Sequence, residues 1–143
     1  MKYEKSSGAI IFRIEKGEPF YLLLYGPSYW GFSKGQIEKS EGEEQTAIRE
    51  AQEESGLKIE ILKGFKEKIK YMYKLNGELI SKQVVFFVAK TNDKKVKISK
   101  EHEDFKWVSL PEALQLMKHK NQKEILKKAD KFIRQWTKQE RLE

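Results

Sequence analysis

The chain has 143 residues, enough for one domain with a real core and too few for two, so we predict a single domain over residues 1–143. Its net charge of +7 comes mainly from lysine and could attract a polyanion, although a solvated lysine-rich surface is the simpler interpretation. The absence of cysteine excludes disulfides, thiolate metal sites and cysteine nucleophiles. There is no apolar leader and no run of about 18 apolar residues, so we expect a soluble, cytoplasmic protein without membrane association.

The first half of the chain predicts a hairpin, a loop and a helix. The apolar runs 7–14 and 19–25 flank a polar, glycine-containing turn and predict two core strands. The aromatic segment 29–35 favours a loop. The pattern then becomes helical and stops at Gly56, which predicts a loop-helix unit over residues 35–57.

The middle of the chain has the composition of β-strands. We predict strands at residues 57–62, 65–75, 78–90 and 105–108. Asn76 and Gly77 form a pair that supplies the positive φ angles of a tight turn. The second and third of these strands should therefore form a long hairpin.

Two helices are predicted near the C-terminus. Ser109 and Glu112 have the spacing of a capping box, which predicts a helix over 110–118. Asn121 and Glu124 repeat this spacing, and the apolar residues after them recur every three or four positions, as in an amphipathic helix. This order of elements predicts an α+β fold, an α/β/α sandwich with a mixed β-sheet and C-terminal helices.

The most informative pattern lies in the loop-helix unit. Glycines, glutamates and one arginine stand at fixed offsets: Gly35, Glu41, Arg49, Glu50, Glu53, Glu54 and Gly56. An accidental match would occur in about one window in ten million or fewer. On a helix the last three glutamates fall within one arc of about 100°. The small or apolar residues of the same helix occupy another arc that could press against a sheet: Ala47, Ile48, Ala51 and Ser55.

Three neighbouring carboxylates repel one another, and a divalent cation would reverse that cost. Hard cations such as Mg²⁺ or Mn²⁺ prefer carboxylate and carbonyl oxygens, and they can bridge phosphates and activate water. A solvated acidic helix face is the usual interpretation of three glutamates alone. The glycines, Glu41 and Arg49 at fixed offsets argue against it here.

The remaining members of the pattern have predicted structural roles. Gly35 permits a backbone conformation in which its carbonyl can turn toward a metal, and Gly56 ends the helix. The planar guanidinium of Arg49 could pair with Glu41 and hold the loop on the helix. The alternative for Arg49 is an ordinary surface ion pair.

Residues 35–57 resemble the Nudix box, and their match to its pattern is complete. The resemblance implies a Nudix-type fold and Mg²⁺-dependent hydrolysis of a nucleoside diphosphate linked to another group. It also implies that Glu50, Glu53 and Glu54 are metal ligands and catalytic residues, with Arg49 beside them.

Outside the box, four segments are similar to the asymmetrical diadenosine-tetraphosphate hydrolases: residues 7–12, 30–35, 70–73 and 101–107. These enzymes share features with bacterial RNA pyrophosphohydrolases. Ser33 stands where such enzymes usually carry proline, and this serine should make the loop less rigid. Lys34, the expected phosphate contact, is present.

Candidate substrate-binding residues lie on the predicted strands and the aromatic loop. Tyr71 and Tyr73 share one face of a strand, where their rings could stack on a purine or belong to the core. The resemblance matches Tyr71 to a base-stacking position. Trp30 belongs to the same motif as Lys34, and its alternative role is structural.

Glu101 precedes the predicted strand 105–108, where the resemblance implies a further carboxylate near the metal. It could be a metal ligand or the general base, and the sequence does not decide between Glu101, Glu50 and Glu53 for the base. His102 is a weaker candidate, since a lone histidine is more often structural.

The sequence thus predicts hydrolysis of a nucleoside polyphosphate, with a dinucleoside tetraphosphate such as diadenosine tetraphosphate as the leading substrate. The alternatives are removal of pyrophosphate from the 5′ end of RNA, cleavage of a nucleoside triphosphate, and a nucleotide-sensing module without catalysis. We expect a small-molecule nucleotide as the partner and a monomer as the oligomeric state.

Overall fold

The computed structural model describes residues 1–142. Its elements are β1 (Lys2–Glu15), β2 (Glu18–Tyr25), β3 (Trp30–Gly31), β4 (Ser33–Gln36), α1 (Glu43–Ser55), β5 (Glu60–Leu75), β6 (Glu78–Lys90), β7 (Asp104–Val108), α2 (Leu110–Leu116) and α3 (Lys120–Leu142). The predicted order of strands, helix, strands and helices is confirmed. The aromatic segment predicted as a loop instead contains β3 and β4, because its backbone pairs with β2 and β1. The terminal helix begins one residue before Asn121, so Asn121 lies inside α3 and is not its N-cap.

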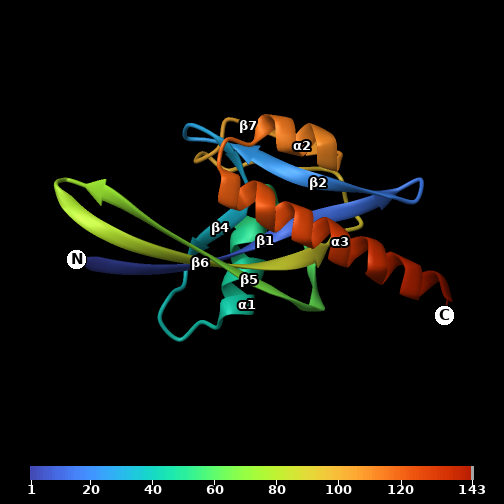
Figure 1. The fold of residues 1–143 in the computed structure, drawn as a ribbon, viewed down its shortest axis with the longest axis horizontal. Coiled ribbons are helices and arrows are strands. Elements are labelled where there is room, and N and C mark those ends of the chain that lie inside the picture. The colour runs from blue at the N-terminus through green and yellow to red at the C-terminus, as the bar shows by residue number, and fades with distance from the viewer. Residues whose placement is uncertain (143) are drawn as a thin grey trace.

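The strands form one mixed sheet. They follow the order β3-β2-β1-β6-β5, while β4 pairs with β1 and β7 pairs with β2. β1 runs antiparallel to β2 and parallel to β6, whereas β5 and β6 form the predicted long hairpin. Asn76 and Gly77 close this hairpin with φ angles of 52° and 79°. The hairpin and the start of β1 extend beyond the helices (Figure 1).

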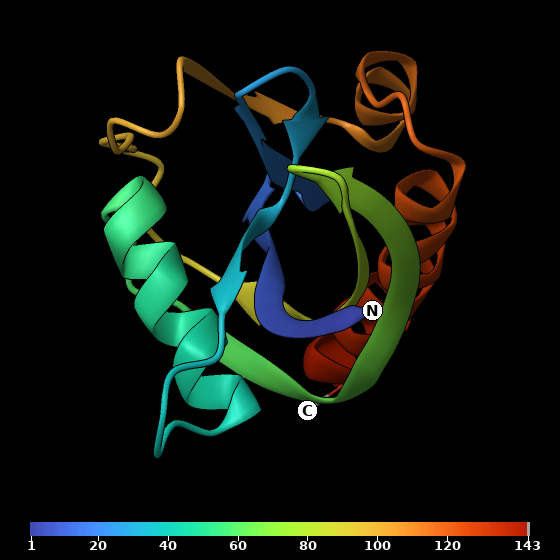
Figure 2. The same ribbon diagram turned by 90° about the vertical axis from the view of Figure 1, so that its left-hand side faces the viewer.

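Helices cover both faces of the sheet, which confirms the α/β/α sandwich. α1 lies on one face, and α2 and α3 lie on the other (Figure 2). Because successive side chains of a strand point to opposite faces, Val84 belongs to the core under α3 and its neighbour Val85 to the core under α1. None of the helices within residues 1–142 has both the length and the apolarity that crossing a membrane requires.

α1 packs on the sheet through its small residues. Ala47 and Ala51 are fully buried, as the helical pattern predicts. Ile48, predicted on the same face, is instead 44% exposed, because it lies at the border of that narrow face. Gly56 follows the helix with a φ of 74°, and its N–H donates to the carbonyl of Gln52 at 2.9 Å. This left-handed conformation favours glycine, so the predicted end of the helix is confirmed.

Candidate active site

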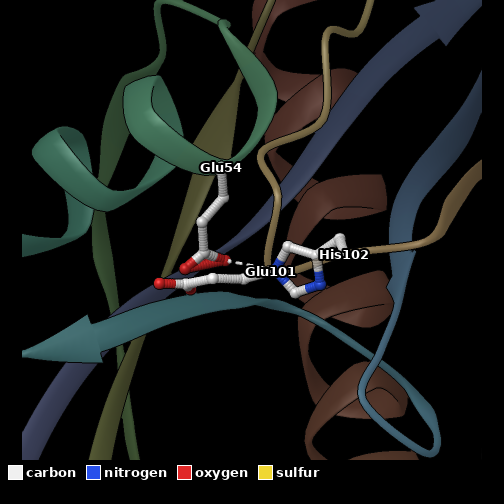
Figure 3. A group of neighbouring side chains, drawn as sticks. All are labelled: Glu54, Glu101 and His102. Atoms are coloured by element: carbon white, nitrogen blue, oxygen red, sulfur yellow. Dashed lines mark hydrogen bonds and ion pairs between the residues drawn. The ribbon is translucent and has the colours of Figure 1, made fainter.

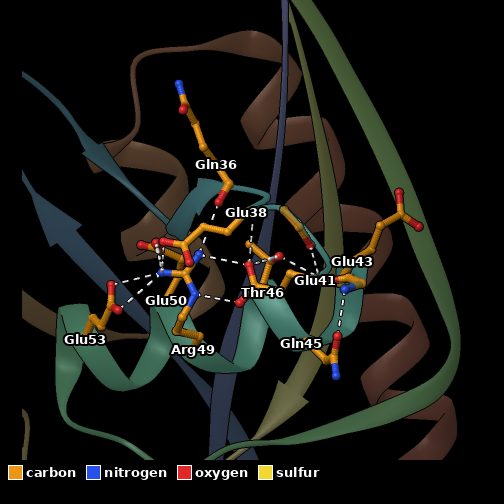
Figure 4. A network of polar contacts seen from close by, with 11 residues as sticks. Gln36, Glu38, Glu41, Glu43, Gln45, Thr46, Arg49, Glu50 and Glu53 are labelled. Atoms are coloured by element: carbon orange, nitrogen blue, oxygen red, sulfur yellow. Dashed lines mark hydrogen bonds and ion pairs between the residues drawn. The ribbon is translucent and has the colours of Figure 1, made fainter.

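Arg49 ties the loop before α1 to the helix. Its Nε and Nη2 donate to the two carboxylate oxygens of Glu41 at 2.7 and 3.0 Å, and Nη2 also donates to the carbonyl of Gln36 at 3.1 Å. The hydroxyl of Thr46 donates to Glu41 at 2.6 Å. These contacts lower the pKa of Glu41 to about 2, with the Arg49 hydrogen bonds as the main cause. The pair that the sequence suggested is therefore present and forms the centre of a larger network (Figure 4).

The three glutamates of the helix face have different surroundings. Glu54 is buried, with 4% of the residue exposed. Glu50 is also mostly buried, and it accepts a hydrogen bond from Arg49 Nη1 at 2.8 Å. The side chain of Glu53 is 57% exposed and contacts Arg49 at 3.2 Å. The helical arc predicted by the sequence thus spans the border between the protein interior and solvent.

Gly35 is required for space at this site. It lies in β4 opposite Ser7 of β1, and its φ is outside the left-handed region. A Cβ atom on Gly35 would overlap the carboxyl carbon and both oxygens of Glu50. The close approach of Glu50 to the β4 backbone therefore explains this glycine, whereas the sequence suggested an unusual backbone conformation.

The loop before β7 brings Glu101 and His102 next to Glu54 of α1. Glu54, Glu101 and His102 each offer one ligand atom, and these atoms lie within 4.8 Å of one another (Figure 3). His102 Nε2 lies 3.1 Å from Glu54 Oε1, and this contact raises the pKa of His102. The loop is held in place because the N–H of Glu103 donates to the carbonyl of Tyr25 at 2.8 Å. His102, a weaker candidate in the sequence, thus lies directly beside the acidic residues.

Two cavities meet beside this cluster. The first, called the aromatic pocket below, has a volume of about 380 Å³ and is lined by Tyr29, Lys34, Ile69, Tyr71, Met72, Val84, Phe86, His119, Asn121 and Gln122. The second, called the acidic pocket, measures about 150 Å³ and is lined by Leu24, Gly26, Pro27, Tyr29, Gly31, Phe32, Lys34, Glu54, Glu101 and His102. Tyr29 and Lys34 line both pockets. Burial lowers the pKa of Lys34, while Glu54 and Glu50 oppose that shift.

Of the three predicted aromatic residues, only Tyr71 lines one of these two pockets. Tyr71 lines the aromatic pocket, and burial raises its pKa to about 12. Tyr73 is on the same strand face with its ring centroid 6.3 Å from that of Tyr71, and its hydroxyl donates to Glu4 at 2.6 Å. Trp30 lines neither of these pockets. Its ring packs edge-on against Tyr25 at 5.1 Å.

A protein-family comparison matches the NUDIX domain to residues 3–129. The chain belongs to the Nudix family. It is 32% identical over 143 residues to an asymmetrical bis(5′-nucleosyl)-tetraphosphatase of Sus scrofa, and the match covers 90% of this chain and 95% of that protein. The corresponding protein of Caenorhabditis elegans is 31% identical over 134 residues, with 90% and 96% covered. The crystal structure of a C. elegans Ap4A hydrolase binary complex is similar, with a TM-score of 0.80 at 31% identity and coverage of 91% and 97%.

Membership in the family makes the protein a Nudix hydrolase, and its acidic residues fit the divalent metal that this family typically uses. Burial and the neighbouring carboxylate of Glu54 raise the pKa of Glu50 to about 7. The negative charges of Glu50 and Glu54 repel each other, and Glu101 lies beside Glu54. Carboxylate oxygens of this kind suit Mg²⁺ or Mn²⁺. Glu54, Glu101 and His102 are the residues whose ligand atoms lie close enough together to hold such an ion.

Several residues in or beside this site were not found from the sequence. Tyr29 belongs to the aromatic segment but carried no motif, and its ring meets His119 edge-on at 4.9 Å. Lys82 lies opposite Tyr71 in β6, where burial and the charge of Lys34 lower its pKa. Gln122 resembled any polar residue at the start of a helix. No local signal marks these positions, since distant elements bring them together.

Proposed function

We propose that the protein hydrolyses a phosphoanhydride bond of a dinucleoside polyphosphate, with diadenosine tetraphosphate as the leading substrate. One observation carries this proposal: Lys34 and Tyr29 line both the aromatic pocket and the acidic pocket. The base of a nucleotide would occupy the aromatic pocket, its phosphates would pass Lys34, and its scissile bond would reach the acidic pocket. The two asymmetrical tetraphosphatases named above, at 31–32% identity, support the choice of substrate.

Each region of the site has a part in this reaction. Tyr71 and Tyr29 would hold the base between aromatic walls, and Lys34 would bind a phosphate at the junction of the pockets. A bound Mg²⁺ or Mn²⁺ would activate the attacking water and neutralise phosphate charge. Arg49 would hold the segment between β4 and α1 against the helix, so that Glu50 stays beside Gly35. A cation at Lys34 can also stabilise charge that develops as the bond breaks.

The three candidate general bases differ in exposure and contacts. Glu53 is 57% exposed at its side chain and contacts Arg49, which disfavours it as a proton acceptor inside the site. Glu50 and Glu101 remain candidates, because both lie next to Glu54. We propose that one of these two carboxylates takes the proton from the attacking water. Replacing each by glutamine and comparing the residual turnover numbers would separate them.

The direct test is hydrolysis of diadenosine tetraphosphate with millimolar Mg²⁺, followed by chromatography of the products. Asymmetrical cleavage by one water yields AMP and ATP in equal amounts, whereas two ADP molecules would contradict it. Glu54→Gln, purified in the same way, controls for contaminating enzymes. Glu44→Gln is the matched control, since Glu44 is an exposed residue of the same helix. No product from any nucleotide of a panel would refute the proposal.

A second candidate is removal of pyrophosphate from an RNA 5′ end. A groove of about 490 Å³ beside the aromatic pocket is lined by Lys68, Lys70, Lys120 and Lys128 among others, and it shares Ile69 and Asn121 with that pocket. These ammonium groups could meet phosphates beyond the first nucleotide, although Lys128 is paired with Glu67 at 2.9 Å. An RNA pyrophosphohydrolase of Pseudoalteromonas translucida is 30% identical over 123 residues. Release of pyrophosphate from a 5′-triphosphorylated RNA faster than cleavage of the dinucleotide would favour this candidate.

A nucleotide-sensing module without catalysis is the non-enzymatic alternative. The box glutamates argue against it, because Glu50 and Glu54 occupy the buried site described above. Calorimetry would support it if a nucleotide bound tightly and no product formed after hours with Mg²⁺ or Mn²⁺.

A further inference from the structure

Gln122 lines the aromatic pocket and carries a buried side-chain oxygen without a hydrogen-bond partner. It lies in the first turn of α3, and 8% of the residue is exposed. Within the part of the chain that the structure describes, its Oε1 has no hydrogen-bond partner. A buried amide oxygen without a donor costs free energy, and native proteins rarely keep one without a reason. A ligand that supplies the missing donor would give such a reason.

The surroundings of Gln122 restrict what that ligand can be. Tyr29, Tyr71 and His119 contribute aromatic rings to the pocket, and Val84 and Phe86 contribute apolar surface. Flat heteroaromatic rings suit such walls. Lys34 stands where this pocket joins the acidic one, so an anionic chain attached to the ring would lead toward Glu54.

A free amide beside a heteroaromatic ring can distinguish one base edge from another. The side chain of glutamine matches adenine, because its oxygen accepts from the exocyclic amino group while its NH₂ donates to a ring nitrogen. Hypoxanthine has a carbonyl oxygen in place of that amino group and carries a hydrogen on N1. Facing Oε1, that carbonyl would leave two acceptors opposed and both without a donor.

We propose that Gln122 is a specificity-determining residue, whose Oε1 accepts a hydrogen bond from the amino group of an adenine held in the aromatic pocket. This inference rests on the proposed function, since it takes the ligand of this pocket to be the base of the nucleotide substrate. It adds the residue that selects the base of that substrate.

Binding and turnover are measured separately to test this assignment. The probes for binding are diadenosine and diinosine tetraphosphates with methylene groups in place of the bridging oxygens, titrated by calorimetry with Mg²⁺. The hydrolysable pair is assayed in parallel. We expect wild-type protein to bind the adenine compound at least about tenfold more tightly, as for an unpaired buried acceptor. The preference in turnover should appear in KM more than in kcat, because the base is remote from the reacting phosphorus.

Three variants assign the effect to this side chain. Gln122→Met keeps the length of the side chain and removes the acceptor, so the ratio of the two dissociation constants should fall below about twofold. Gln122→Glu keeps an acceptor oxygen and should retain the preference for adenine, which provides a second variant if the methionine protein does not fold. Gln135→Met makes the same change at an exposed position of α3 and should behave as wild type.

The outcomes separate this inference from the proposed function. Equal binding of the two compounds by wild-type protein, or a preference that survives Gln122→Met, would overturn the role of Gln122 while hydrolysis could still stand. A preference for the inosine compound would also overturn it, because the amide NH₂ would then face the base. Preferential binding of the adenine compound without turnover would support Gln122 and refute the hydrolase. Binding of neither compound, together with no turnover of the hydrolysable pair, would count against both.

Discussion

Gly35→Ala should abolish most of the activity without unfolding the protein. The added Cβ would overlap the carboxyl group of Glu50, while the backbone φ of Gly35 is one that alanine can adopt. Ordinary carbon contacts need about 3.5 Å, so the carboxyl must move by about 1 Å or more. A displacement of about 1 Å in a catalytic group can cost about a hundredfold in rate.

The stability of Gly35→Ala should change little. The overlapping atoms are the end of the Glu50 side chain. At a compatible backbone conformation, alanine in place of glycine stabilises the fold by about 0.4–1 kcal/mol, because the unfolded chain has less conformational entropy. We expect the melting temperature to move by no more than about 4 °C. Steady-state kinetics with diadenosine tetraphosphate and a melting curve measure the two effects on one preparation.

Gly42→Ala is the matched control for this prediction. A Cβ there would have Gln45 Oε1 as its nearest atom, at 3.5 Å, and the φ of Gly42 is −85°. It should keep wild-type turnover, with a loss of up to about 1 kcal/mol at the helix N-cap. If Gly35→Ala keeps more than about a third of wild-type kcat, the packing of Glu50 against β4 does not matter for catalysis and our reasoning fails.

Four further predictions concern the same site. Glu54→Gln should lower turnover by orders of magnitude with the fold intact, and a rate above about half of wild type at saturating Mg²⁺ would contradict the metal assignment. Millimolar Mg²⁺ or Mn²⁺ should raise the melting temperature, by an amount equivalent to about 2.7 kcal/mol at a hundredfold excess over Kd; an unchanged curve would count against the site. Tyr71→Ala should raise KM about tenfold or more with a smaller effect on kcat, while Tyr71→Phe should be nearly neutral, and a loss of stability without a change in KM would make the tyrosine a core residue. Hydrogen bonds from Arg49 and then Thr46 lower the pKa of Glu41 from 4.5 to about 2, so the contribution of the Glu41 carboxylate to folding is present above pH 4.5 and is lost as the pH falls toward 2. The difference in unfolding free energy between wild type and Glu41→Gln, measured with denaturant, should shrink over that range, and a constant difference would refute this origin.

The sequence by itself determined the features that depend on local spacing. Period-two and helical patterns predict the hairpins and α1, and the turn at Asn76 and Gly77 follows from the conformational freedom of that pair. The box predicts that Glu50 and Glu54 lie on one helix next to Arg49. Such features involve neighbours in the chain, so the identities of the residues carry the information.

Only the tertiary structure decided how these parts meet. The pairing of β2 with β7 helps to bring the loop with Glu101 and His102 to Glu54, and the pairing of β1 with β4 places Gly35 against Glu50. Contacts between residues far apart in sequence depend on strand order and register, which local patterns do not encode. For the same reason the sequence did not reveal that Gln122, more than 85 positions after Gly35, lines a pocket with Lys34.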